Sequence, residues 1–234
     1  MASTVPDALS TTEAPADPSL TGPSTAGELR SPARAESAEV SRRVRRWTIL
    51  ALALGGFGIG TTEFVAMGLL PNIAGSLGVS EPTAGHVISA YAMGVVVGAP
   101  LIAALTARMS RRTLLIGLMV AFTVGNLATV LAPDYGLLLV ARFVAGLPHG
   151  AYFGVAALVA AHLAGPRNRG KAVGQVMLGL SVANVLGVPA AAWLGETFGW
   201  RSAFAIVVVI GIATVVALIR VLPTLTGMKT TDPL

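Results

Sequence analysis

The sequence contains no cysteine and little charge. The absence of cysteine among its 234 residues excludes disulfide bonds and thiolate metal sites. Charged residues make up 12% of the chain, whereas about 25% is usual in soluble globular domains. Aromatic residues are also scarce, at 6%. The three histidines, His86, His149 and His162, lie far apart in the sequence, so their spacing predicts no metal site.

Apolar residues dominate instead, at 54% of the chain with a mean hydropathy of +0.75. From Trp47 onward they fall into six runs, each near the length of about 20 residues that crosses a bilayer. Only helices and closed barrels satisfy the backbone in lipid, and the alternation that a barrel requires is missing. We therefore predict an all-α membrane protein with six transmembrane helices, at about 47–70, 83–107, 112–132, 136–163, 172–195 and 202–223.

Residues 1–46 are rich in alanine, serine, threonine, proline and glutamate and offer little apolar surface to bury. This composition is typical of intrinsic disorder, so we expect a disordered cytoplasmic tail. Two pairs of arginines end the segment, just before the first apolar run. We interpret them as a cytoplasmic anchor rather than a twin-arginine export signal, because five further apolar runs follow and no convincing cleavage site does.

The positive charges lie at the ends of the apolar runs. The formal net charge is +5, yet residues 1–46 contribute none of it, because they hold six arginines and six acidic residues. Basic connections alternate with connections that contain Glu81, Asp134, Glu196 and a single arginine, Arg201. Lysine and arginine mark cytoplasmic loops, so we predict that both termini are cytoplasmic and expect no nucleic-acid partner. The marking residues are Arg108, Arg111, Arg112, Arg167, Arg169, Lys171, Arg220 and Lys229.

Glycines spaced four residues apart recur within or beside the apolar runs. Such pairs let two helix backbones approach closely in a membrane. We therefore predict a tightly packed bundle, with contacts at Gly56–Gly60, Gly94–Gly98, Gly146–Gly150, Gly150–Gly154 and Gly170–Gly174.

Several polar side chains lie at similar depth. At 1.5 Å per residue, Glu63, Arg142 and Asn126 lie roughly 9–11 Å below the extracytoplasmic edge of the apolar layer. Tyr91 lies at about 12 Å by the same rule, and Asn184 lies nearer the middle. An ionisable side chain at this depth is costly, which marks it as a candidate functional residue. We predict a polar layer, in which Tyr91, Asn126 and Asn184 either line a substrate path or join helices by hydrogen bonds.

Glu63 and Arg142 carry the only opposite full charges at that depth. A carboxylate whose arginine partner comes and goes with conformation can load and release a proton, so we expect the two to face one cavity and interact directly or through water. A static pair that only fixes the first and fourth helices is the alternative. His149 follows Arg142 by seven residues and shares its helix face, where it binds substrate, relays protons or bonds to a neighbouring helix. Pro148, flanked by glycines, predicts a kink.

Together these segments resemble the major facilitator superfamily, specifically bacterial drug/proton antiporters similar to arabinose-efflux permeases and chloramphenicol-efflux proteins. The resemblance extends from Trp47 to Pro223. It is carried by "GTTEFVAMGLLPNIA", "SAYAMGVVVGAPLIAAL", "RFVAGLPHGAYFGV", "GLSVANVLGVPAAAWLG" and "GWRSAF".

The resemblance implies roles for particular residues. Arg142 with Gly146 stands in the helix-4 arginine motif that is associated with proton coupling. The fifth span resembles the glycine-proline motif of antiporters, but reads Gly187-Val188-Pro189 where Gly-Pro is usual. That motif weakly favours efflux over uptake.

A second motif of the family lies between the second and third spans. Its usual aspartate and glycine are replaced here by Ala107 and Ser110, so cytoplasmic anchoring is favoured over a charge relay. The motif residues that are present are Gly98, Arg108, Arg111 and Arg112.

Members of this family have twelve spans in two six-helix halves, with the substrate site between them. This chain holds one such half, and residues 224–234 would begin the central cytoplasmic loop. We expect a truncated or fragmentary chain, or else a second polypeptide or a second copy that supplies the other half.

The resemblance implies proton-coupled efflux of a sugar or drug-like compound across the cell (inner) membrane by alternating access. The proton gradient would be the energy source, without a cofactor or metal. The expected partners are the lipid bilayer, a small-molecule substrate and the missing half. An enzyme is not expected, because no catalytic set of residues falls on facing helices. The alternative function is a non-transporting half-length subunit that scaffolds or regulates a partner.

Overall fold

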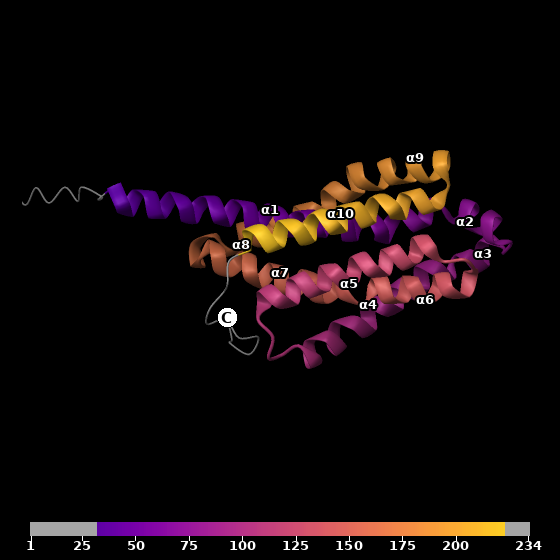
Figure 1. Cartoon of the computed structure of the whole chain (residues 1–234), viewed down its shortest axis with the longest axis horizontal. Helices are drawn as coiled ribbons and strands as arrows, with labels where there is room; N and C mark the ends of the chain where they lie inside the picture. Colours follow the sequence, from indigo (N-terminus) through magenta and orange to yellow (C-terminus); the bar gives the residue numbers. More distant parts are fainter. Residues whose placement is uncertain (1–31, 223–234) are drawn as a thin grey trace, which may run out of the picture. The chain divides into compact units, whose positions relative to one another are not determined.

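The computed structural model describes residues 32–222 (Figure 1), with side chains from residue 41 onward. The chain divides into two compact units, and the bundle belongs to the unit that begins at Glu39. The described part of the chain is helical, without β-strands. Its α-helices are α1 (Pro32–Gly68), α2 (Leu70–Leu77), α3 (Glu81–Ala84), α4 (His86–Leu105), α5 (Arg111–Leu131), α6 (Tyr135–Gly146), α7 (Pro148–Ala164), α8 (Arg169–Val182), α9 (Val188–Phe198) and α10 (Trp200–Val221). A 3-10 turn, η2 (Pro166–Asn168), precedes α8, and a π-helix, η3 (Ala183–Gly187), joins α8 to α9.

Six helical stretches are long and apolar enough to cross a membrane, as the sequence predicted. They are Ser41–Gly68, Glu81–Leu105, Arg111–Leu131, Tyr135–Ala164, Pro166–Phe198 and Trp200–Val221. The fourth is interrupted, because α6 ends at Gly146 and α7 begins at Pro148. Proline cannot donate the backbone hydrogen bond that would continue α6, which explains the interruption expected there.

The first helix begins earlier than predicted. α1 starts at Pro32, whereas the sequence analysis placed an irregular tail up to residue 46. Residues 32–46 are rich in alanine, glutamate and arginine, which are strong helix formers, and proline is favoured at the first position of a helix. The rest of the predicted tail, 1–31, and the predicted loop, 224–234, lie outside the described residues.

Glycines bring the backbones of α4 and α6 together. A Cβ atom on Gly146 would overlap the carbonyl oxygen of Tyr91, and one on Gly94 would overlap that of Phe143. One turn further along α4, Gly98 lies against Leu147 in the same way. α4 packs along α6, while α10 packs along α5 (Figure 1). The predicted glycine contacts are thus confirmed in the second and fourth spans.

The glycine prediction also holds in α1 but fails for three other glycines. Gly56 lies against Phe153 of α7 and Val176 of α8, and Gly60 lies against Leu180 of α8 and Ala183 of η3, as a packing role requires. A Cβ atom on Gly154, Gly170 or Gly174 would instead have no neighbour within 4 Å, and all three residues are exposed. The spacing of glycines alone does not say which face of a helix meets a neighbour.

Two separate apolar cores fill opposite ends of the bundle. We call them the basic-end core, which lies toward the helix ends that carry the arginines, and the acidic-end core, which lies toward Glu81 and Asp134. Both draw buried residues from α1 and α10, but from different turns of each helix. The basic-end core includes Leu52, Ile59, Leu115, Phe122, Tyr152 and Leu218. The acidic-end core includes Val65, Leu69, Ile73, Leu138, Trp200 and Phe204.

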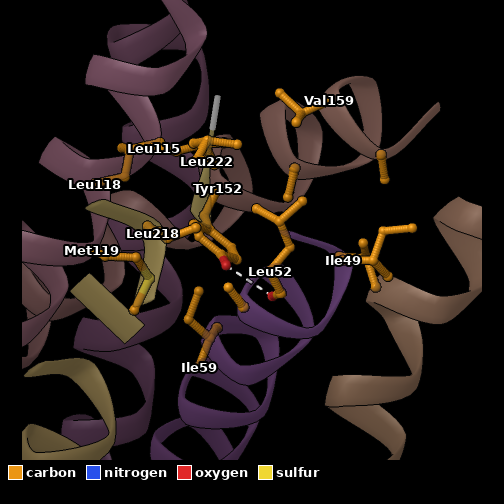
Figure 2. Packing of buried hydrophobic residues seen from close by; sticks show 14 of the residues in the cluster. Ile49, Leu52, Ile59, Leu115, Leu118, Met119, Tyr152, Val159, Leu218 and Leu222 are labelled. Carbon is orange, nitrogen blue, oxygen red and sulfur yellow. Dashed lines mark hydrogen bonds between the residues drawn. The ribbon is translucent and has the colours of Figure 1, made fainter. Parts of the chain in front are cut away.

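Tyr152 anchors the basic-end core (Figure 2). Its fully buried hydroxyl donates a hydrogen bond of 2.8 Å to the carbonyl oxygen of Leu52, which joins α7 to α1. We expect Tyr152→Phe to lower the free energy of unfolding by about 0.5–1.5 kcal/mol, the usual net value of one such bond. Thermal unfolding of the chain in detergent measures this effect. Thr197→Val, which removes an exposed bond within α9, should change the same midpoint much less; equal shifts would contradict the anchoring role.

Candidate functional site

Arg142 lies fully buried at the centre of the bundle, on α6. Its Nη1 donates to Thr62 Oγ1 at 2.9 Å and its Nη2 donates to the Thr62 carbonyl oxygen at 3.1 Å. The guanidinium carbon lies 4.4 Å from the centroid of the Tyr91 ring and 5.1 Å from that of Phe204. Residues of α1, α4 and α10 therefore hold one cation on α6. Within residues 41–222, the buried Nε of Arg142 has no hydrogen-bond acceptor.

The network continues from Thr62 to α5. The Thr62 hydroxyl donates to Asn126 Oδ1 at 2.6 Å, and Asn126 Nδ2 donates to the carbonyl oxygen of Phe122 at 2.9 Å. Both side chains are fully buried. Arg142, Thr62 and Asn126 thus form a connected polar layer, and they occupy the turns between the two apolar cores. The predicted layer exists, with Arg142 and Asn126 in it.

Glu63 does not pair directly with Arg142 within the described residues. Arg142 binds Thr62, the preceding residue, while Glu63 is only half-buried. Successive residues of a helix point about 100° apart, so a Thr62 that faces Arg142 turns Glu63 aside. The direct pairing that the sequence analysis allowed is absent from this conformation, and the proton-carrying role stays a prediction.

Tyr91 extends the polar layer to His149. The Tyr91 ring covers the Arg142 guanidinium, and its hydroxyl lies 3.0 Å from His149 Nδ1. The imidazole is half-buried and packs on Phe153, with ring centroids 5.4 Å apart. The contacts therefore lead from the fully buried Arg142, through Tyr91, to the half-buried His149. An interhelical hydrogen bond, one of the roles considered for His149, is present.

Asn184 does not join this layer. It lies exposed in η3, and its amide donates to the carbonyl oxygen of Leu180 in its own helix. The π-helix ends at Gly187, two residues before Pro189, which cannot continue an α-helical hydrogen-bond ladder. Gly187 itself lies against Thr61 and Phe57 of α1. The glycine-proline segment is thus a widened turn where the fifth span touches the first, a feature often found at functional sites.

The arginines between α4 and α5 contact the bundle end. Arg112 Nη2 donates to the carbonyl oxygen of Ile219 at 2.9 Å, which ties α5 to the end of α10. Arg111 is buried in the first turn of α5, and Arg108 is exposed. Ser110 caps α5 by accepting from the Thr113 amide. Arg112 thus ties α5 to α10 and Ser110 caps α5, while cytoplasmic anchoring by these arginines stays a prediction.

Sequence reasoning missed Thr62 and Phe204. Thr62 binds both Arg142 and Asn126, and Phe204 covers part of the guanidinium. Thr62 precedes the carboxylate that attracted the prediction, in the run "GTTEF". A polar residue beside a membrane carboxylate was the only available signal. No sequence signal distinguishes Phe204 from the other apolar residues of α10.

Comparison with known proteins adds a family and a fold. A model of the Major Facilitator Superfamily matches residues 52–232. Inner membrane transport protein YdhP from Escherichia coli (strain K12) is 50% identical over 177 residues, which are 76% of this chain and 46% of that protein. Chloramphenicol resistance protein from Streptomyces lividans is 37% identical over 172 residues, covering 74% of this chain and 44% of that protein. The chain thus spans about half the length of these relatives.

A solved structure shows the same helix arrangement. The proton:xylose symporter XylE of E. coli, bound to 6-bromo-6-deoxy-D-glucose, matches with a TM-score of 0.70 at 18% identity. The match covers 79% of this chain and 46% of that chain. At this identity the likeness establishes the fold and carries no statement about substrate.

Proposed function

Because the chain belongs to the Major Facilitator Superfamily, we propose that it is the N-terminal half of a proton-coupled efflux transporter that works by alternating access. The family consists of membrane transporters and not of enzymes, and the chain is a multi-pass membrane protein. The proposal places it in the cell (inner) membrane, where one relative by its name resides. The complementary half would come from a longer form of the chain or from a second polypeptide.

The observation that carries this proposal is the buried position of Arg142. A cation inside the apolar layer costs several kcal/mol, on the order of 3 kcal/mol by insertion scales. Two hydrogen bonds and two aromatic rings offset part of that cost, while Nε has no acceptor within the described residues. A side chain that serves packing alone would be apolar, because apolar residues fill such a position without this cost. The guanidinium therefore supports a functional role.

We propose that Arg142 exchanges partners during transport. In the described conformation it binds Thr62, which leaves the carboxyl of Glu63 without a direct cationic partner and open to a proton. A movement of α1 against α6 that brings Glu63 in place of Thr62 would pair the carboxylate with the guanidinium and displace that proton. Because Thr62 and Glu63 are adjacent, a rotation of about 100° about the helix axis separates the two partners.

The open end of the polar layer supports a proposal for the substrate class. At this end the half-buried imidazole of His149 lies beside the ring of Phe153 and is bonded to the buried Tyr91 hydroxyl. Such a surface suits a small neutral or amphiphilic molecule with hydroxyl or amide groups, such as a sugar or an antibiotic. A relative named for chloramphenicol resistance agrees with that class, and another named as a probable sugar efflux transporter agrees with outward transport.

Replacing Glu63 with glutamine tests the proton role directly. Glutamine keeps the size and hydrogen-bonding capacity of the side chain but cannot carry the proton. In proteoliposomes that contain the whole transporter, an imposed pH gradient should drive substrate flux in the native protein. In Glu63→Gln that flux should fall to the level of protein-free liposomes. Glu196→Gln, which alters an exposed carboxyl at the end of α9, is the matched control and should keep native flux.

Two outcomes would count against the proposal. Unchanged coupling in Glu63→Gln would remove Glu63 as the proton carrier. An absence of flux in the native protein for every sugar and drug-like compound, together with tight association with another membrane protein, would favour a scaffolding subunit instead.

A further inference from the structure

A groove of about 770 Å³ runs between α1 and α8, close to the end of α7. Its floor is the point where the two helices touch, because Gly179 of α8 lies against the backbone of Ala53. It lies apart from the polar layer, since neither Arg142 nor His149 lines it. The groove is therefore a separate site to which the proposed transport cycle gives no role.

One end of the groove is basic. Arg45 and Arg46 of α1 lie there together with Lys171, from the first turn of α8. Among residues 41–222, no acidic residue lines the groove. The N-terminus of α8 adds the positive end of a helix dipole, and Asn168 and Gln175 add neutral hydrogen-bond donors. This end fits an anionic group that carries several acceptor oxygens.

The rest of the groove is apolar. Leu50, Leu54 and Phe57 continue along α1 from the two arginines, and Leu178 and Val182 face them from α8. From Arg45 to Phe57 the helix rises about 18 Å. One leaflet of a bilayer has an apolar depth of about 15 Å. The basic end and the apolar stretch are thus spaced like the headgroup and the acyl chain of one lipid molecule.

We propose that this groove binds one anionic phospholipid, with its phosphate at Arg45, Arg46 and Lys171 and an acyl chain along Leu54 and Phe57. Basic pockets between membrane helices on the cytoplasmic side are suited to anionic headgroups, and this groove lies on the side predicted to be cytoplasmic. A soluble anion would use only the basic end and would leave the apolar stretch without an occupant. The site stabilises the contact between the first and fifth spans and does not depend on transport.

Native mass spectrometry of the purified chain in detergent tests the site. Phosphatidylglycerol and phosphatidylcholine with the same acyl chains are added separately. We expect the anionic lipid to remain bound and the zwitterionic lipid to dissociate. The double variant Arg46→Gln/Lys171→Gln removes two exposed cations and should bind phosphatidylglycerol about tenfold more weakly or worse, from the usual contribution of each basic residue near an anionic surface.

The matched control is Arg108→Gln/Arg220→Gln, which removes two exposed cations from the same end of the bundle outside the groove. It should retain the lipid within about twofold of the native chain, because only charges near the headgroup contribute. If the first double variant does not fold, as judged by its helical circular dichroism, Lys171→Glu alone provides the same comparison.

The proposal is overturned if the groove variant keeps its lipid, or if both variants lose it equally. Equal retention of phosphatidylcholine would also overturn it. Full displacement of the lipid by glycerol 3-phosphate, which has the headgroup chemistry without acyl chains, would show a site for soluble anions instead. None of these readouts involves flux, so a failure here is distinct from a failure of the proposed transport function.

Discussion

Replacing Arg142 with methionine should abolish proton-coupled flux while leaving the bundle folded. Methionine fills a similar volume without a charge and is a good helix former. Because the guanidinium is fully buried and its Nε has no acceptor within the described residues, its removal relieves a desolvation cost. That relief offsets the lost hydrogen bonds to Thr62, so the free energy of unfolding should change by no more than about 2 kcal/mol in either direction.

The measurement pairs flux in proteoliposomes with thermal unfolding in detergent. Arg201→Met is the control. Arg201 donates to the carbonyl oxygens of Val130 and Ala132 and stacks on Trp200 at the bundle end, outside the polar layer. Its replacement should lower the unfolding midpoint but leave proton coupling intact. A large loss of stability in Arg142→Met with coupling preserved would make Arg142 a static link between helices.

Gly146→Val is expected to have the largest effect on folding. A Cβ atom there would overlap the carbonyl oxygen of Tyr91 and lie 3.2 Å from the amide nitrogen of Val95. Both obstacles are backbone, so a rotamer change cannot relieve the overlap and α4 must move away from α6. That movement also withdraws the Tyr91 ring from Arg142. We expect a loss of about 3 kcal/mol or more, and measurement by thermal unfolding and by the yield of monodisperse protein in detergent.

Gly154→Val is the matched control for that substitution. Gly154 lies on the same span, is exposed, and has no atom within 4 Å of a Cβ built on it. The control should change the unfolding midpoint only slightly, because valine is a somewhat weaker helix former at an open position. If both variants unfold at the native temperature, the close approach of α4 and α6 does not limit the stability of this bundle.

The contrast between Gly146 and Gly154 also shows which features of the fold can be predicted from the sequence. Hydropathy predicts the six spans, because length and composition are local properties that a bilayer constrains strongly. It does not predict which face of a span meets a neighbour, since lipid and protein are both apolar. The early start of α1 at Pro32 was missed for a related reason, because a helix that leaves the apolar layer has no hydropathy signal.

The polar layer, too, could be predicted in depth but not in the direction of its side chains. Depth along a helix follows from counting residues, and counting brought Arg142 and Asn126 together correctly. The direction in which a side chain points around the helix axis depends on the neighbouring helices, which residue counting does not reveal. For this reason counting did not show that Thr62, and not the adjacent Glu63, binds Arg142. Asn184 is exposed in η3 and bonds within its own helix rather than to a neighbouring one, so its place in a substrate path stays a prediction.

The division of the apolar interior into two blocks has a mechanical consequence. A continuous apolar core would resist opening along the whole length of the bundle. Here the polar layer of hydroxyl, amide and guanidinium groups separates the basic-end core from the acidic-end core. The buried residues of the two cores form separate clusters, so we expect one core to loosen with less disturbance of the other than in a continuous core. An interior divided in this way would suit the proposed alternating access, in which the pathway must not open to both sides of the membrane at once.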